Sequence, residues 1–324
     1  MSETNRSALS YQAAYQLANV TKTTAQFGSL TPRWLPRFLD WKSLETGIYR
    51  LNKVKEEGFA GSTVTDPLCC MDGCCRNIDD NSFVQDGYIG YEEFPREYRL
   101  NALSTIINID TRVADLYSSP YGQTEEQIRL AVESLKERQE MQLVNSSDYG
   151  LLHQIAEPQR IKPIAGTPTP DDFDELISKV WKEPSFFLAH PRAIAAFGRE
   201  CTRRGVPPAT VSFYGTNFLT WRGIPIVPSD KLLIDDGKTP KGKGGKTNIL
   251  LIRTGENKRG VLGLHQADLP GGTSRGLAVR FMGVNQRGFA SYLLSVYCSL
   301  AVLADDAAAL LENVDVGNYY KYDK

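Results

Sequence analysis

The densest group of reactive side chains in this sequence is a run of four thiols, formed by Cys69, Cys70, Cys74 and Cys75. The gap between Cys70 and Cys74 falls within zinc-knuckle spacing, but a structural zinc site normally takes its second pair of ligands from elsewhere in the chain. The other two cysteines, Cys201 and Cys298, lie in apolar segments and are typical of small core residues. The run is suited to binding zinc, to forming disulfides between subunits or to carrying sulfane sulfur, and a loop without a chemical role explains it as well.

Catalysis has little support in the types and spacing of the other polar residues. The three histidines, His153, His190 and His265, lie far apart, and none belongs to an HExxH or comparable metal-binding pattern. The sequence also lacks a GxSxG nucleophile elbow. His190 directly precedes Pro191, which is more typical of a residue that orients the start of a helix. We therefore predict that the chain is not an enzyme and has no catalytic residue, metal or cofactor of its own.

A Lys/Gly-rich loop at residues 237–247 comes nearest to a phosphate-binding motif. A Walker A loop requires Gly, four residues of any type, and then Gly-Lys followed by Ser or Thr. In one register Pro240 replaces the first Gly, and in the other Gly244 replaces the hydroxyl residue. Because both registers fail, we interpret this segment as a solvated loop.

Length and composition argue against several classes of function. A chain of 324 residues is long enough for about two domains. Its net charge of −1 lacks the basic excess that nucleic-acid-binding proteins show. No stretch reaches the roughly 18 apolar residues of a transmembrane helix, and the first residues lack the apolar core of a signal peptide. With no secretion signal, the cysteines indicate a reducing, cytoplasmic location, and we expect neither a membrane nor nucleic acid as a partner.

The longest uninterrupted helical signal spans residues 124–145 and contains neither Gly nor Pro. Thr124 is a suitable N-cap, and acidic residues fill the first turn, where the helix dipole favours negative charge. Apolar residues recur at helical spacing in the first half, whereas the second half is mostly polar. This pattern predicts a helix of roughly 33 Å that lies on a surface and is covered on one side.

The segments before this helix predict an N-terminal arm and a long hairpin. The arm, residues 1–46, carries the bulky apolar side chains Trp34, Leu35, Phe38, Leu39 and Trp41. We expect them to pack into the same subunit or a neighbour, and a membrane-surface element is the less favoured alternative. Residues 47–98 read as two strands that can pair, with the cysteine run at the tip between them. Residues 99–123 are expected to form a helix that ends at a Ser-Ser-Pro turn.

The rest of the chain alternates between helices and strands. We predict helices from Pro170 to Lys182 and from Pro191 to Gly205, each with Pro in the first turn. Strands are predicted at residues 185–189, 218–227, 248–253 and 276–283. The apolar segment 289–303 suits a long buried strand better than a helix, although its periodicity does not decide between the two.

Several long tracts resemble the shell proteins of family 2 encapsulins. They include NVTKTTAQFGSLTPRWLPRFLDWKSLETGIYRLN, DELISKVWKEPSFFLAHPRAIAAFGRECTRRG and RFMGVNQRGFASYLLSVYCSLAVLADDAAALLENV. The resemblance covers nearly the whole chain. The cysteine run and the Lys/Gly loop depart from it and have the character of local insertions.

The resemblance implies an α+β fold, the Hong Kong 97 phage-type major capsid fold. The parts of that fold would be an N-terminal arm at 1–46, an E-loop at 47–98, a P-domain at 99–150 and 284–324 with a spine helix at 124–145, and an A-domain at 151–283. One branch of the family carries an inserted cyclic-nucleotide-binding domain, for which this chain is too short. The resemblance therefore implies the branch that encloses a cysteine desulfurase, whose pyridoxal phosphate belongs to the cargo, and that serves sulfur storage.

The function expected from this resemblance is a shell of about sixty copies, or a multiple, that encloses protein cargo. The alternative is a phage-type capsid protein that encloses nucleic acid, which the near-neutral charge disfavours. In this fold the A-domain tips meet at five-fold axes, where a basic lining would favour entry of small anions. Our candidates for the pore lining are Arg203, Arg204, Gly205, Val206, Ser212 and Tyr214, together with Lys241 and Lys243 of the Lys/Gly loop.

Overall fold

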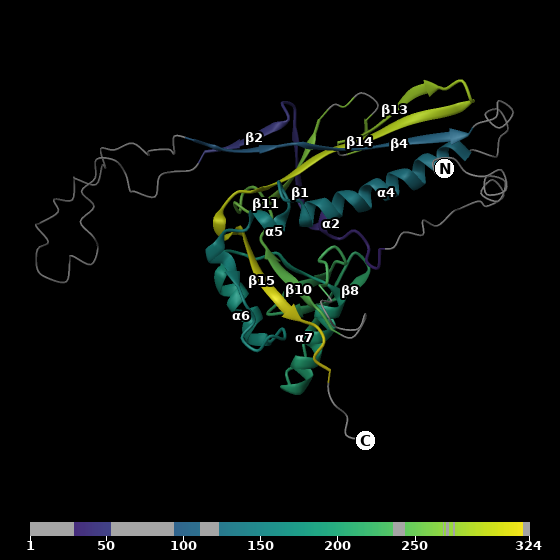
Figure 1. Cartoon of the computed structure of the whole chain (residues 1–324). Coiled ribbons are helices and arrows are strands. Elements are labelled where there is room, and N and C mark those ends of the chain that lie inside the picture. The colour runs from purple at the N-terminus through teal and green to yellow at the C-terminus, as the bar shows by residue number, and fades with distance from the viewer. Residues whose placement is uncertain are drawn as a thin grey trace, which may run out of the picture. The chain divides into compact units, whose positions relative to one another are not determined.

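The computed structural model describes residues 29–52, 94–110, 123–235, 244–267, 269, 272–274 and 276–319 (Figure 1). The chain divides into two compact units, one of Ile48–Tyr98 and one of Met1–Gly47 with Arg99–Lys324. In the smaller unit, β2 (Ile48–Leu51) pairs with β3 (Arg96–Arg99) as a two-stranded sheet. This pairing confirms the predicted return of the hairpin at its base. The cysteine run lies outside the described residues.

The larger unit contains a six-stranded sheet organised around its longest strand, β14 (Phe289–Val302). This strand confirms the prediction for the apolar segment 289–303. Along the main path of the sheet, the order is β1 (Asp40–Leu44), β11 (Val261–Gln266), β14, β13 (Leu277–Val284) and β12 (Gly272–Ser274). The remaining strand, β4 (Asn101–Asp110), pairs antiparallel with β14 from Asp110 opposite Phe289 to Asn101 opposite Cys298.

The presence of β4 shows that the helix predicted at 99–123 is wrong over residues 101–110. Thr105, Ile106, Ile107 and Ile109 are β-branched and therefore favour an extended backbone over a helix. Alternate residues of this strand also differ in burial, since Leu103 and Ile109 are buried whereas Ile106 is 55% exposed. Such alternation is the pattern of a strand with one covered face.

The predicted long helix is confirmed as α4 (Gln123–Asn145), which begins one residue before the proposed N-cap Thr124. It packs along β4 and β14 and covers one face of the six-stranded sheet (Figure 1). The apolar stripe was expected in the first half of the helix, but the second half is the more buried one. Leu143 and Val144 are fully buried there, and so is Glu140.

The second sheet of the larger unit has seven strands. Its order is β5 (Arg160–Ile161), β15 (Ala308–Asp315), β10 (Lys246–Ile252), β6 (Phe186–Ala189), β9 (Ile224–Pro228), β8 (Thr216–Trp221) and β7 (Ala209–Phe213). The single strand predicted at 218–227 is therefore two strands. Arg222 and Gly223 both have positive φ, 49° and 85°, which suits the tight turn of a hairpin. The strand β15 was not predicted.

Two helices pack against the seven-stranded sheet, and both confirm the sequence prediction. The first, α6 (Pro170–Lys179), ends three residues earlier than expected. The Thr169 hydroxyl and the Asp172 carboxylate cap its first turn reciprocally, and Phe173 and Leu176 are buried. The second, α7 (Pro191–Arg203), buries Ala193, Ala196 and Phe197.

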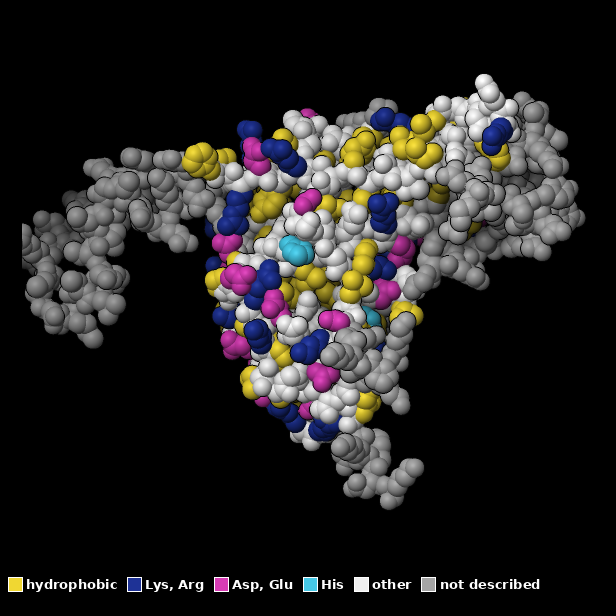
Figure 2. Space-filling view, viewed as in Figure 1, with side chains coloured by type: hydrophobic (Ala, Val, Ile, Leu, Met, Phe, Trp, Pro, Cys, Tyr) yellow, Lys and Arg dark blue, Asp and Glu magenta, His cyan; other side chains and the backbone are white. Residues whose placement is uncertain are grey.

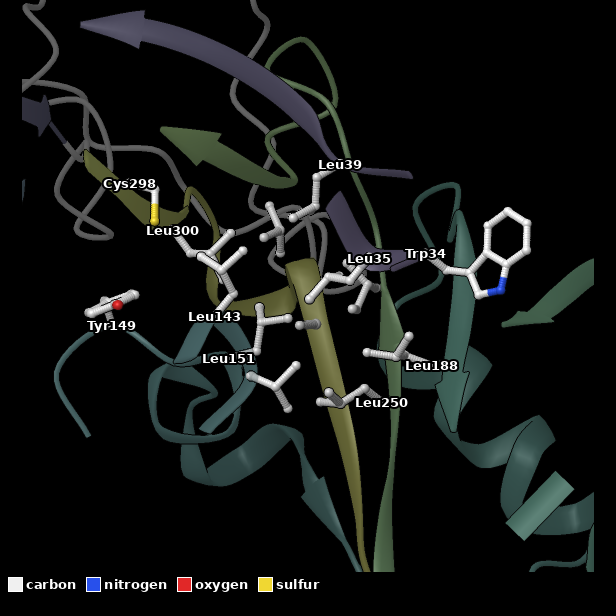
Figure 3. Packing of buried hydrophobic residues seen from close by; sticks show 14 of the residues in the cluster. Trp34, Leu35, Leu39, Leu143, Tyr149, Leu151, Leu188, Leu250, Cys298 and Leu300 are labelled. Carbon is white, nitrogen blue, oxygen red and sulfur yellow. The ribbon is translucent and has the colours of Figure 1, made fainter. Parts of the chain in front are cut away.

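The arm joins the core of its own subunit. Trp34, Leu35 and Leu39 are all buried, around the short helix α2 (Leu35–Phe38). Figure 3 shows Leu35 among residues of α4, α5 (Leu151–Gln154) and both sheets, including Leu143, Leu151 and Leu188. The expectation that these side chains pack into the protein is confirmed for this subunit. Short 3-10 helices at Glu157–Gln159 and Asp305–Ala307 complete the described elements.

The boundaries proposed for the P-domain and A-domain remain predictions. The sheets do not follow these boundaries. Strands β11 and β12, within residues 151–283, belong to the sheet of β14, whereas β15, within residues 284–324, pairs with β10 of the other sheet.

Candidate functional site

The four residues Arg203 to Val206 form the end of α7 and the loop that follows it. His190 stands at the start of this helix, where its Nδ1 accepts a hydrogen bond from the backbone N–H of Arg192 at 3.0 Å. Burial lowers the pKa of His190, which favours the neutral imidazole that this contact needs. At the other end, Gly205 has φ +70°, and the N–H of Val206 donates to the carbonyl of Cys201 at 3.0 Å.

Both guanidinium groups at this helix end have carboxylate partners. Arg203 bonds Glu200 of the same helix at 2.5 Å, and Arg204 bonds Asp171 in the first turn of α6 at 2.7 Å. Val206 is 46% exposed beside them. The loop therefore presents paired charges and an apolar side chain rather than a free cluster of positive charge.

The candidates Ser212 and Tyr214 lie at the opposite end of β7 from this loop. Tyr214 has φ 50° at the turn between β7 and β8, and its ring lies 5.6 Å from the ring of Phe38 in the arm. The five residues of β7 place Tyr214 roughly 15 Å from the loop Arg203–Val206. Within one subunit the structure thus brings Arg203, Arg204, Gly205 and Val206 together, and keeps Ser212 and Tyr214 apart from them. Lys241, Lys243 and Cys69, Cys70, Cys74 and Cys75 lie outside the described residues.

A polar network that we did not predict from the sequence holds the arm to the rest of the subunit. Asp230, after β9, accepts hydrogen bonds from the N–H of Leu30 at 2.6 Å and the hydroxyl of Thr31 at 3.0 Å. Lys231 is nearly buried and pairs with both Asp230 and Glu137 of α4, each at 2.8 Å. Although burial raises it, hydrogen bonds from Lys231, Leu30 and Thr31 hold the pKa of Asp230 below its ordinary value.

Glu140 is the most deeply buried carboxyl group of this network. Its Oε1 accepts the backbone N–H of Leu35, the first residue of α2, at 3.2 Å. Its Oε2 has no hydrogen-bond partner among the described residues. Burial raises the pKa of Glu140 from 4.5 to about 7. The arm is therefore held on α4 by a group that titrates near neutral pH.

One signal in the sequence points to this network. Glu133, Glu137 and Glu140 recur at spacings of four and three residues, which places three like charges on one face of a helix. Such a face requires cations from elsewhere, and Arg33 supplies one, 2.6 Å from Glu133 and 3.4 Å from Glu137.

Neither a metal centre nor a membrane span is found in the described part of the chain. Across these residues, no group of three or more His, Cys, Asp or Glu side chains is placed to hold a metal ion. No helix there is long and apolar enough to cross a membrane. On the face shown in Figure 2, acidic and basic side chains are interspersed, without a large area of one sign.

The two sheets, the long helix along one of them and the docked arm define the class of fold to which the chain belongs, that of phage capsid proteins. The same fold occurs in the capsid of the native GTA particle, with a TM-score of 0.56 and 12% identity over 91% of this chain and 95% of the other. It also occurs in the capsid of the cyanophage P-SCSP1u, with a TM-score of 0.53 and 11% identity over 90% and 91% of the two chains. These structures establish the Hong Kong 97-type α+β fold.

The chain belongs to the type 2A encapsulin shell proteins. Residues 75–318 match the family described as SrpI-like type 2A encapsulin shell protein. The shell protein SrpI of Synechococcus elongatus is 53% identical over 96% of this chain and 95% of its own length, and that of Mycolicibacterium paratuberculosis is 50% identical over 97% of each. The holo-SrpI encapsulin complex from S. elongatus superimposes with a TM-score of 0.78 over 98% of this chain and 99% of the other.

Family membership fixes the general role of the chain. Encapsulin shell proteins assemble with copies of themselves into icosahedral nanocompartments, and their role is structural rather than catalytic. The predicted family and fold are thereby confirmed.

Proposed function

We propose that the nanocompartment built from this chain encloses a cysteine desulfurase and serves the storage of sulfur in the cytoplasm. The observation that carries this proposal is the match to type 2A shell proteins over 96% of the chain, which leaves no room for an inserted domain. The S. elongatus relative has been solved as a holo complex, which supports a loaded state for such shells.

The chemistry of the released sulfur gives the shell and its cargo different roles. Sulfur released from cysteine is reactive and damages other thiols or precipitates. A wall with narrow pores lets cysteine and alanine pass while it retains larger sulfur aggregates. The shell chain supplies the enclosure, and the pyridoxal phosphate that labilises the substrate belongs to the enclosed enzyme.

Two parts of the chain would serve this function directly. We assign the pore lining at the five-fold axes to the loop Arg203–Val206, because it joins exposed side chains at one end of α7. We assign sulfur binding or cross-linking between subunits to the thiol run Cys69, Cys70, Cys74 and Cys75, because the thiolate of cysteine is the form that reacts with sulfur species and with other thiols.

Cargo docking would use the inner wall of the shell. A disordered extension of the desulfurase, ordered on binding, suits this task because it covers much surface with few specific contacts. Repetition of the docking site by the symmetry of the shell then makes weak contacts collectively strong.

The test is co-expression of this chain with a cysteine desulfurase of the same genome that carries a disordered extension. Shells should co-purify with a yellow, pyridoxal-phosphate-containing protein that resists added protease until the shell is opened. Deleting the extension of the desulfurase should abolish loading and leave assembly unchanged. Absence of desulfurase from the shells, or equal loading without the extension, would refute the cargo assignment. Nuclease-resistant nucleic acid inside the particles would instead favour the capsid alternative.

A further inference from the structure

Trp181 is exposed to a degree that the other tryptophans of the chain are not. Its exposed fraction is 77%, whereas Trp34 and Trp221 are buried, at 4% and 6%, and Trp41 is half-buried. It lies in the short loop between α6 and β6. A large aromatic side chain in water is unfavourable, and tryptophan is strongly enriched among residues that dominate protein interfaces.

The loop that carries Trp181 is held rigidly. The N–H of Glu183 donates to the carbonyl of Trp181 at 2.9 Å, and Glu183 itself has φ 56°, which a non-glycine residue adopts only where its surroundings enforce it. Lys258 pairs with Glu183 at 2.7 Å. An ordered loop has little conformational entropy to lose on binding, so an exposed aromatic residue on it is already prepared for a partner.

The buried side chain of Arg253 binds the loop that carries Trp181. This residue is 1% exposed, and its Nη1 donates to the carbonyl of Lys182 at 3.3 Å. Its Nη2 bonds Asp306 at 2.7 Å, and its backbone N–H donates to Ala307 at 2.9 Å. Arg253 and Asp306 belong to the two connections that run between the sheets, from β10 to β11 and from β14 to β15. The tryptophan is thus presented from one of the most constrained points in the subunit.

The charged side chains next to Trp181 in the sequence already have partners within the subunit. Lys182 pairs with Asp306 at 3.4 Å, and Glu183 pairs with Lys258. A partner therefore needs no complementary charge here, and an apolar surface is the one that fits. The chain itself exposes such a surface on β13, where Phe281, Met282 and Val284 are 59%, 57% and 61% exposed.

We infer that Trp181 anchors a contact between neighbouring subunits, so that its partner is a second copy of this chain. Encapsulin shells are built from copies of one chain, and every copy therefore presents this residue to an identical neighbour. A contact between two different patches of the same chain is heterologous, and such contacts form a ring where the rotation between neighbours closes. The inference rests on family membership and does not depend on the identity of the cargo.

Fluorescence of shells expressed without any cargo tests the inference. Subtracting the signal of Trp181→Phe from that of the wild type isolates the emission of Trp181. In assembled empty shells this emission should be shifted to shorter wavelength and quenched by acrylamide at least about threefold less than in dissociated subunits. Equal quenching in the two states would overturn the inference, and so would protection that appears only when desulfurase is loaded.

A second measurement tests the inference even if the variant Trp181→Phe assembles poorly. A photo-crosslinking residue at position 181 should join two shell chains in empty particles, and the absence of a cross-linked dimer would contradict the inference. Trp181→Ala should raise the concentration needed for assembly at least about tenfold, as expected for an interface anchor. Ile164→Ala is the matched control, since Ile164 is 79% exposed outside this loop, and it should have a smaller effect.

Discussion

The carboxyl group of Glu140 in α4 and the backbone N–H of Leu35 in the arm meet at 3.2 Å, and both residues are fully buried. A side chain of α4 thus binds the main chain of the arm at Leu35, the first residue of α2. The strength of this contact depends on the charge state of one buried carboxyl group, whose pKa burial raises to about 7.

The first prediction is that stability falls as pH rises through neutrality. Because the pKa of Glu140 is raised in the folded state, its contribution is fully present below 4.5 and is lost as pH rises through about 7. Such a shift corresponds to at most about 3 kcal/mol. Glu140→Gln, which mimics the neutral form, should flatten the dependence of the thermal midpoint on pH between 5 and 8. Glu125→Gln, at an exposed position of the same helix, should leave the slope unchanged. An unchanged slope in Glu140→Gln would refute this role.

The second prediction concerns the pair formed by the buried Arg253 and the half-buried Asp306. Arg253→Met should lower the free energy of unfolding by about 3 kcal/mol, because it leaves a carboxylate and several carbonyl groups without their donor. Arg222→Met is the control: its pair with Asp174 is exposed, so the free energy of unfolding should fall much less. The hydrogen bond from Arg253 lowers the pKa of Asp306, so the contribution of this pair is lost as pH falls below the ordinary range of a carboxyl group. Chemical denaturation at neutral and acid pH measures both effects, and equal losses for the two arginine variants would contradict the argument.

The third prediction concerns the pore lining. Replacing Arg203 and Arg204 by Ala should slow the entry of a small anion into the shell more than that of a neutral molecule of equal size. Arg222→Ala, a paired surface arginine elsewhere, should not. The same measurement with Lys241 and Lys243 replaced separates the two candidate loops. Unchanged flux in both sets of variants would remove these residues from the pore.

The fourth prediction concerns the thiol run. Replacing Cys69, Cys70, Cys74 and Cys75 by Ser should leave the shells assembled, because Cys201 and Cys298 are the buried cysteines of the described core. Sulfur bound per shell, or the amount of disulfide-linked dimer on a non-reducing gel, should fall. If neither quantity changes, the run is a neutral insertion.

Elements with strong local signals were predictable from the sequence. Pro at the first turn with acidic residues behind it located α6, and the absence of Gly and Pro located α4. The failures occurred where pairing with distant residues decides the structure. Residues 101–110 form a strand because ten of them pair with β14. The segment 308–315 is a strand because it lies between β5 and β10.

The polar network at the arm was beyond prediction for a similar reason. Asp230 and Thr31 are far apart in the chain, and neither residue type is unusual at its position. Only the three glutamates on one face of α4 showed that cations must come from elsewhere. The family, by contrast, could be predicted, because long tracts of sequence carry the resemblance directly.

The place of β14 and β15 in the sheets also determines when the subunit can be finished. Each is an interior strand, with β14 between β11, β13 and β4, and β15 between β5 and β10. Both are synthesised after all of the strands with which they pair. The arm strand β1 likewise has to wait for β11, its parallel partner at residues 261–266. The six-stranded sheet therefore cannot close before residue 302 has been made, nor the seven-stranded sheet before residue 315, so nascent chains that stop earlier should lack the surfaces of a folded subunit and should not enter the growing shell.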